Sequence, residues 1–157
     1  MTKLQKISFF LLRISLGWLF FYSGITKVLA PAWSAEGYLK GAKMLAPFYN
    51  WLLQPNILPV TNFLNEWGLT LIGAALILGV VVRLSAVLGA LIMLLYYIPL
   101  GFPFPNPNSY IVDQHIIYIF SLLALGAFKA GRVMGLENWC SNLPICRKFP
   151  RLRSLLG

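Results

Sequence analysis

The fold is decided by the stretch Arg13-Ile-Ser-Leu-Gly17-Trp-Leu-Phe-Phe-Tyr-Ser-Gly24-Ile-Thr-Lys27. It is apolar enough for the interior of a bilayer, yet it carries a cation at each end. At about 100° per residue, a helix places five of these residues within a stripe about 80° wide: Arg13, Gly17, Phe20, Gly24 and Lys27. Glycines allow a second helix to approach closely, and lipid disfavours charges that face it. The stripe is therefore predicted to face other helices of the same protein.

The whole chain has the composition of a membrane protein. Its 157 residues are 59% hydrophobic and 11% charged, which predicts one domain with a bilayer as its solvent. The net charge of +9 would indicate nucleic-acid binding in a soluble protein. Here six of the thirteen basic residues follow residue 128, beyond the last apolar run, as in a cytoplasmic tail. We therefore predict a lipid bilayer as the partner, and no nucleic acid.

Four apolar runs predict an all-α integral membrane protein, a bundle of four transmembrane helices. The expected spans cover residues 7–29, 67–82, 84–100 and 114–129. The second and third belong to one run that would be about 52 Å long as a single helix, against a bilayer of about 30 Å, so the chain must fold back. Gly79 and Arg83 mark that turn. Residues 1–137 form the predicted membrane domain, and residues 138–157 a basic cytoplasmic tail.

The connections between the spans are also informative. Residues 32–65 contain Pro47, Pro55 and Pro59, which interrupt a long helix, and several aromatic rings suited to the lipid-water boundary, so we expect short interfacial helices. The proline-rich segment 101–108 is expected to be a stiff external loop. Asp113 follows it as the expected N-cap of the fourth span.

The distribution of cations predicts the orientation. With both termini in the cytoplasm, nine cations lie inside and two, Lys40 and Lys43, lie outside. We thus predict a multi-pass protein of the cytoplasmic (inner) membrane, with Lys27 at the extracytoplasmic rim and Arg13 toward the cytoplasm. A cleaved signal peptide is the alternative for the first span, because Ala30-Pro31-Ala32 matches a cleavage pattern. Arg13 interrupts the run, however, and the run is too long for a signal peptide.

Several motifs resemble a known family. They are Arg13-x3-Gly17 followed by Phe-Tyr-Ser-Gly24-x2-Lys27, then Glu66-x-Gly68, Gly79-x3-Arg83 and Gly131-Arg132-x2-Gly-Leu136. Together they resemble the DoxX family of four-helix membrane proteins, and more closely its DoxD-like branch, known as the membrane subunit of thiosulfate:quinone oxidoreductase. The resemblance implies a quinone-linked role outside the cytoplasm. It brings no catalytic assignment for individual residues.

A more distant resemblance is to membrane proteins related to vitamin K epoxide reductase, which need a Cys-x-x-Cys pair beside a quinone pocket. The two cysteines of this chain, Cys140 and Cys146, are separated by five residues and lie in the predicted tail. Dithiol chemistry in the membrane is therefore not expected. We interpret these cysteines as reduced thiols.

Three residues are the candidate catalytic groups: Lys27, Glu66 and His115. Lys27 and Glu66 are expected near the outer ends of neighbouring spans, where opposite charges attract. Lys27 either attracts an anionic substrate or polarises a quinone carbonyl, with Glu66 relaying protons, or the two form a structural clamp. His115, the only histidine, either delivers a proton to a reduced quinone or is an ordinary interfacial residue. If residues 113–115 were all helical, Asp113 and His115 would be about 200° apart and could not share a pocket.

Other residues are candidates for quinone stacking or for structural roles. Trp67, Tyr96 and Tyr118 are the rings expected to stack on a quinone, although most rings in such a chain anchor it in the lipid. Arg13 either turns inward along its stripe or reaches out to lipid phosphate. Arg83 is interpreted as a turn residue of the positive-inside side.

The leading hypothesis is a membrane component of a quinone-linked redox system that handles reduced sulfur. One histidine excludes a bis-histidine haem, and the sequence contains no flavin, nicotinamide, iron-sulfur or metal motif. Electrons would come from a partner subunit or a small anionic donor. The alternative is a non-catalytic scaffold or assembly partner, and a homo-oligomer fits either role. A small-solute transporter is less consistent with the sequence, which contains no evident inverted repeat.

Overall fold

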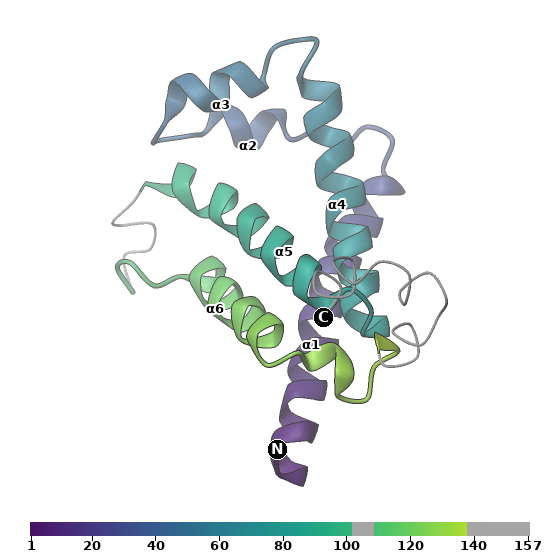
Figure 1. Ribbon diagram of the computed structural model, residues 1–157. Helices are drawn as coiled ribbons and strands as arrows, with labels where there is room; N and C mark the ends of the chain where they lie inside the picture. The colour runs from purple at the N-terminus through teal and green to yellow at the C-terminus, as the bar shows by residue number, and fades with distance from the viewer. Residues whose placement is uncertain (102–108, 138–157) are drawn as a thin grey trace, which may run out of the picture.

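The computed structural model describes residues 1–101 and 109–137, and these are predominantly helical (Figure 1). The predictions for Cys140, Cys146, the basic tail and the proline-rich loop 102–108 lie outside the described residues. The helices are, in order, α1 (Lys3–Val28), α2 (Glu36–Lys40), α3 (Ala46–Leu52), α4 (Leu58–Leu78), α5 (Val82–Tyr97), the 3-10 turn η1 (Ile98–Leu100), α6 (Gln114–Ala127) and the 3-10 turn η2 (Ala130–Arg132).

The four long helices form two pairs, α1 with α4 and α5 with α6, and α4 and α5 join the pairs (Figure 1). In the described part of the chain, two helical segments are long and apolar enough to cross a membrane, Lys3–Val28 and Val82–Leu100. Helix α4 has sufficient length, but Asn62, Asn65 and Glu66 make its first half more polar. Helix α6 is apolar and has only 14 residues. Crossing by α4 and α6 therefore remains a prediction.

Helix α4 begins earlier than expected. It starts at Leu58, whereas the second span was expected to start at residue 67. Pro59 was expected to interrupt a helix, but it lies in the first turn of α4, where its missing N–H costs no hydrogen bond and its fixed φ suits a helix. The predicted turn between the second and third spans does occur. Gly79 and Val81 both have positive φ there, 68° and 54°.

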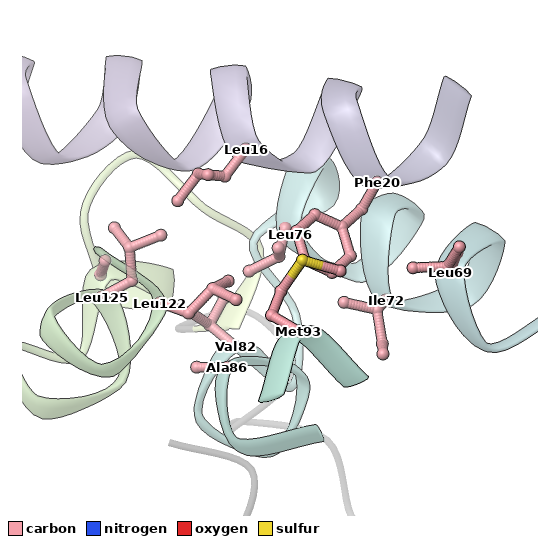
Figure 2. Close-up of a cluster of buried hydrophobic side chains, with 11 residues drawn as sticks. Leu16, Phe20, Leu69, Ile72, Leu76, Val82, Ala86, Met93, Leu122 and Leu125 are labelled. Carbon is pink, nitrogen blue, oxygen red and sulfur yellow. The ribbon is translucent and has the colours of Figure 1, made fainter. Parts of the chain in front are cut away.

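The predicted stripe of α1 is buried against the other long helices. Leu16 and Phe20 project into an apolar core that all four long helices share (Figure 2). The core comprises Leu16, Phe20, Leu69, Ile72, Leu76, Val82, Ala86, Met93, Leu122, Leu125 and Ala130. The prediction that the stripe faces protein is confirmed for Arg13, Gly17, Phe20 and Gly24, which are buried.

The glycines of this stripe bring α1 and α4 into backbone contact. A Cβ on Gly17 would lie 2.9 Å from the backbone nitrogen of Ile77. A Cβ on Gly24 would overlap the backbone nitrogen of Thr70, and one on Gly73 would overlap the backbone of Phe21. Small residues are the means by which helices approach this closely in a membrane.

Helices α2 and α3 cover the end of the bundle opposite the N-terminus (Figure 1). We call this the capped end. Buried Ala35, Leu39 and Tyr49 form a second small core there, with Leu58 of α4 and Ile98 of η1 packed against it. Residues 32–57 thus form a packed cap over the helix ends and contain the short helices that were expected, whereas residues 58–65 belong to α4.

Two hydrogen bonds join the cap to the C-terminal end of α5 and to η1. In an α-helix the carbonyl of Leu95 would accept a bond from residue 99, but Pro99 has no N–H. The hydroxyl of Tyr49 on α3 donates to this carbonyl instead, at 2.9 Å. The backbone N–H of Lys43 also donates to the carbonyl of Pro99, at 2.9 Å. The cap therefore supplies donors that the end of α5 lacks.

Candidate functional site

Polar side chains from four helices or their caps meet at the capped end. We call this group the capped-end cluster: Lys27 of α1, Asn65 of α4, Tyr96 of α5, and Asp113 and His115 at the start of α6. Asp113 is buried and the other four are half-buried. The cluster unites two of the three predicted catalytic residues and one of the three predicted stacking rings.

Lys27 is held by amide, hydroxyl and ring contacts. Its Nζ donates to Asn65 Oδ1 at 3.2 Å and to Ser23 Oγ at 3.3 Å. The same nitrogen lies 5.1 Å from the ring centroid of Trp33 and 5.8 Å from that of Tyr96. Ring faces stabilise a cation electrostatically. The ammonium group is therefore fixed beside the Tyr96 ring.

Glu66 was expected to be the first partner of Lys27. Within the described residues, Lys27 forms hydrogen bonds with Ser23 and Asn65 and none with Glu66, whose charge attracts it over a longer distance. Asn65 and Glu66 are consecutive on α4, so a step of about 100° turns only one of them directly toward Lys27. The expected attraction between Lys27 and Glu66 is therefore present, but the residue of α4 that binds Lys27 directly is Asn65.

Tyr96 connects the two halves of the cluster. Asn65 Nδ2 donates to the Tyr96 hydroxyl, and the hydroxyl of Tyr38 on α2 donates to the backbone carbonyl of Tyr96. The rings of Tyr96 and His115 meet edge to face, with centroids 6.2 Å apart and an interplanar angle of 87°. Burial raises the pKa of Tyr38 to about 12, with smaller contributions from Tyr49, Tyr96 and Asp113, so its hydroxyl stays a donor.

Asp113 and His115 form a close pair. Asp113 caps α6 by accepting the backbone N–H groups of His115 at 2.9 Å and Ile116 at 3.2 Å. Its second oxygen lies 2.5 Å from His115 Nδ1. The expected N-cap is confirmed, and the two side chains meet because residues 113–115 are not all helical; only an all-helical segment would have kept them apart. Asp113 is extended, with φ −117° and ψ −176°, so the 100° helical step does not apply to it.

The other predicted quinone-binding rings lie elsewhere. Trp67 is 40% exposed and packs beside Phe63 on the outer face of α4, with ring centroids 6.4 Å apart. Tyr118 packs against the main apolar core. Among residues 1–101 and 109–137, no three His, Cys, Asp or Glu side chains gather into a possible metal site.

The sequence of the chain also identifies its protein family. The sequence matches the DoxX family over residues 8–100, more than half of the chain. The chain belongs to the DoxX family. No curated protein and no solved structure matches it. DoxX is a membrane family, in agreement with the two membrane-length apolar helices of this chain. The matched region of this DoxX protein contains Lys27, Asn65 and Tyr96, whereas Asp113 and His115 follow it.

The other end of this DoxX protein carries a second charged group. We call it the basic end, since it holds Arg13, Arg83, Lys129 and Arg132. Arg13 is completely buried, and its Nη2 donates to the carbonyls of Met134 at 3.0 Å and Val133 at 3.4 Å. The inward orientation of Arg13, one of two alternatives from the sequence, is thus observed. Arg13 lies in the N-terminal half of α1 and Lys27 in its last turn, so the two charges do not form one site, as predicted.

Glu137 is the acidic residue of the basic end. It is buried, and its charge and that of Arg13 attract each other. Burial raises the pKa of the Glu137 carboxyl above its ordinary value, although three neighbouring cations act in the opposite direction. Gly79 and Gly135 leave the space in which the Arg13 guanidinium lies, and a Cβ on Gly135 would be 2.8 Å from its Nη1. The motif glycines therefore accommodate a buried arginine.

Proposed function

We propose that this DoxX protein is the membrane component of a quinone-linked redox system, of the DoxD-like type that accepts electrons from a reduced-sulfur donor. One observation supports the proposal above the others. Lys27, Asn65 and Tyr96 are joined by hydrogen bonds, the Tyr96 ring meets the His115 ring edge to face, and His115 pairs with Asp113, so the five residues form a continuous series of contacts at the capped end. A site that protonates and orients a quinone needs a cation or donor for a carbonyl oxygen and a titratable group within reach.

Each residue has a distinct role in the proposal. His115 holds the proton to be transferred, because the Asp113 carboxylate binds Nδ1 and leaves Nε2 for exchange. Asp113 positions the imidazole. Lys27 supplies positive charge for a carbonyl oxygen or for an anionic donor, and Asn65 and Ser23 hold its ammonium in place. Tyr96 provides a ring face between these two functions.

The donor set of the cluster fits a quinone head group, whose two carbonyl oxygens accept hydrogen bonds. A bound quinone supplies a two-electron acceptor that takes up two protons. The described residues include no electron-carrying motif, so we expect a partner subunit or a small anionic donor to deliver the electrons. The positive-inside rule supports an extracytoplasmic position for the capped end, with both termini in the cytoplasm.

The second candidate function is a non-catalytic scaffold for partner subunits. It is favoured by the internal pairing of the cluster, since Lys27, Asn65 and Tyr96 bind one another. In that role the cluster fixes the helix ends, and Lys27 has no substrate to attract.

A turnover assay separates the two candidates. The full chain is purified with and without its co-purifying partners, reconstituted in liposomes, and supplied with a short-chain ubiquinone analogue and either thiosulfate or sulfite. Quinone reduction is followed by absorbance. Turnover that falls at least about tenfold in His115→Gln and in Lys27→Met supports the redox role. Lys40→Gln is the matched control, because Lys40 is an exposed cation of the same end that pairs with Glu36.

The expected result is that Lys40→Gln retains the turnover of the unchanged protein. Absence of turnover in every combination, with the quinone supply intact, would contradict the redox proposal and favour the scaffold. Equal loss in all three variants would show that the cluster has no specific role.

A further inference from the structure

We propose that the hydroxyl of Tyr96 donates a hydrogen bond to a carbonyl oxygen of the quinone, and that Asn65 positions the hydroxyl for this contact. The inference rests on the proposed redox function and deepens it, because it gives Tyr96 a second role beside that of a ring face. It follows from the directions of the hydrogen bonds that join Lys27, Asn65 and Tyr96.

Lys27 fixes the direction of the first hydrogen bond. An ammonium group has three donors and no acceptor, so the atom of Asn65 that lies 3.2 Å from Lys27 Nζ must be the amide oxygen. The amide nitrogen of Asn65 then faces Tyr96 and donates to the Tyr96 hydroxyl oxygen. The Tyr96 oxygen is therefore an acceptor toward Asn65.

The hydroxyl proton of Tyr96 is consequently available to a ligand. A phenol carries one proton, and the contact with Asn65 does not use it. The hydroxyl donates to none of the residues that the structure describes, and Tyr96 is only half-buried. A quinone carbonyl oxygen accepts hydrogen bonds and has no proton of its own, so it complements this hydroxyl.

The surroundings of Tyr96 make it a strong and well-ordered donor. Hydrogen bonds in a chain polarise one another, so the charge of Lys27 acts through Asn65 to strengthen the bond that the Tyr96 proton makes. The backbone carbonyl of Tyr96 accepts from the Tyr38 hydroxyl, and the His115 ring packs against the Tyr96 ring. A donor that is held in place in advance stabilises the charge that develops on an oxygen as electrons arrive. The Tyr96 hydroxyl keeps its proton in this role, and His115 remains the proton donor.

The test is infrared spectroscopy of the purified full chain in detergent, with a short-chain ubiquinone analogue that is isotope-labelled at its carbonyl carbons. A hydrogen bond lowers the stretching frequency of a carbonyl group, so one carbonyl band of the bound quinone should be downshifted. Tyr96→Phe keeps the ring and removes only the hydroxyl. We expect it to abolish this downshift and to weaken quinone binding about two- to tenfold, as for the loss of one hydrogen bond. Binding is measured by quenching of tryptophan fluorescence.

Asn65→Asp tests the positioning role while the Tyr96 hydroxyl is intact. A carboxylate accepts hydrogen bonds and donates none, so it keeps the contact with Lys27 and turns the Tyr96 proton toward itself. The same carbonyl band is therefore expected to lose its downshift. If Asn65 only supported the fold, this substitution would leave the band of the bound quinone unchanged.

Each variant has a matched control. Asn62→Asp adds the same charge to α4 about one turn before Asn65, where the side chain bonds to Ser34 and Ala35 of the cap. Tyr22→Phe removes a hydroxyl from an exposed side chain of α1. Both controls are expected to keep the downshifted band and the affinity of the unchanged protein. Circular dichroism verifies that every variant keeps its helices.

A downshift that persists in Tyr96→Phe or in Asn65→Asp would overturn the inference, and so would its loss in a control. The redox proposal would still stand in that case if Lys27→Met and His115→Gln lower turnover. A Tyr96-dependent band without any quinone reduction would support the hydrogen bond and contradict the redox proposal. A quinone that does not bind to the unchanged protein would contradict both.

Discussion

The contact between α1 and α4 gives a prediction that one pair of substitutions tests. A Cβ added at Gly73 would overlap the backbone nitrogen and Cα of Phe21, and would lie 2.7 Å from the carbonyl oxygen of Gly17. Because the added Cβ would clash with backbone atoms of α1, no side-chain movement can relieve the clash. The substitution would therefore force α1 and α4 apart. Gly68 is on the same helix, and a Cβ there would meet only the Cδ1 of Ile92, at an ordinary 3.6 Å.

The two alanine substitutions have the same effect on helix propensity and different effects on packing. Both gain about 1 kcal/mol of helix propensity when glycine is replaced. Gly73→Ala also incurs the overpacking cost of about 1–3 kcal/mol, and we expect the upper part of that range because the clash involves backbone. Gly68→Ala is therefore neutral or stabilising, whereas Gly73→Ala is less stable than Gly68→Ala by about 2–3 kcal/mol.

The assay is equilibrium unfolding in mixed micelles with increasing dodecyl sulfate, followed by far-ultraviolet circular dichroism. The difference in unfolding free energy between the two variants isolates the helix contact, because the propensity term cancels. A Gly73→Ala protein within about 0.5 kcal/mol of Gly68→Ala would refute the close packing of α1 on α4.

Three further predictions concern the cap and the basic end. Tyr49→Phe removes the donor to the Leu95 carbonyl and is expected to lower the unfolding free energy by about 1 kcal/mol in the same assay, with no change as the contradicting result. The raised pKa of Tyr38 means that its stability contribution is complete below pH 10 and is lost as the pH rises toward 12; Tyr38→Phe should remove this alkaline decline in thermal stability. The raised pKa of Glu137 means that its contribution is complete below pH 4.5 and is lost as the pH rises through the folded value. Glu137→Gln should therefore flatten the pH dependence of the unfolding free energy in that window. An unchanged pH dependence would contradict a raised pKa of Glu137 in the folded protein.

The apolar pattern predicted the long helices because their burial follows periodicity. The stripe of α1 is the strongest example, since two glycines and an inward arginine at helical spacing have few alternatives in a bilayer. The start of α4 was not predicted, because a proline breaks a helix in its interior but is favourable in its first turn, and Pro59 was interpreted as a breaker. Only the tertiary contacts of the cap, such as those of Leu58, show that Pro59 begins a helix rather than ends one.

The sequence predicted the end of the bundle at which the candidate site lies, but not which residues contact one another there. Lys27, Tyr96 and His115 were expected at one end and meet there, because the spacing of the spans placed their helix ends together. Asn65 was missed because an amide beside a carboxylate carries no distinctive signal in a single sequence. The pairing of Asp113 with His115 was missed for a different reason, since a helical step was applied to a capping residue that is extended.

The central claim is that the capped-end cluster is the quinone site, and photolabelling tests it most directly. The full chain in liposomes is irradiated with an azido-ubiquinone analogue, and the labelled peptides are identified by mass spectrometry. We expect label on the peptides that contain Tyr96 or His115, displaced by excess unlabelled quinone and reduced in Lys27→Met. Label that appears instead around Arg83 and Lys129, or that excess quinone does not displace, would contradict the claim.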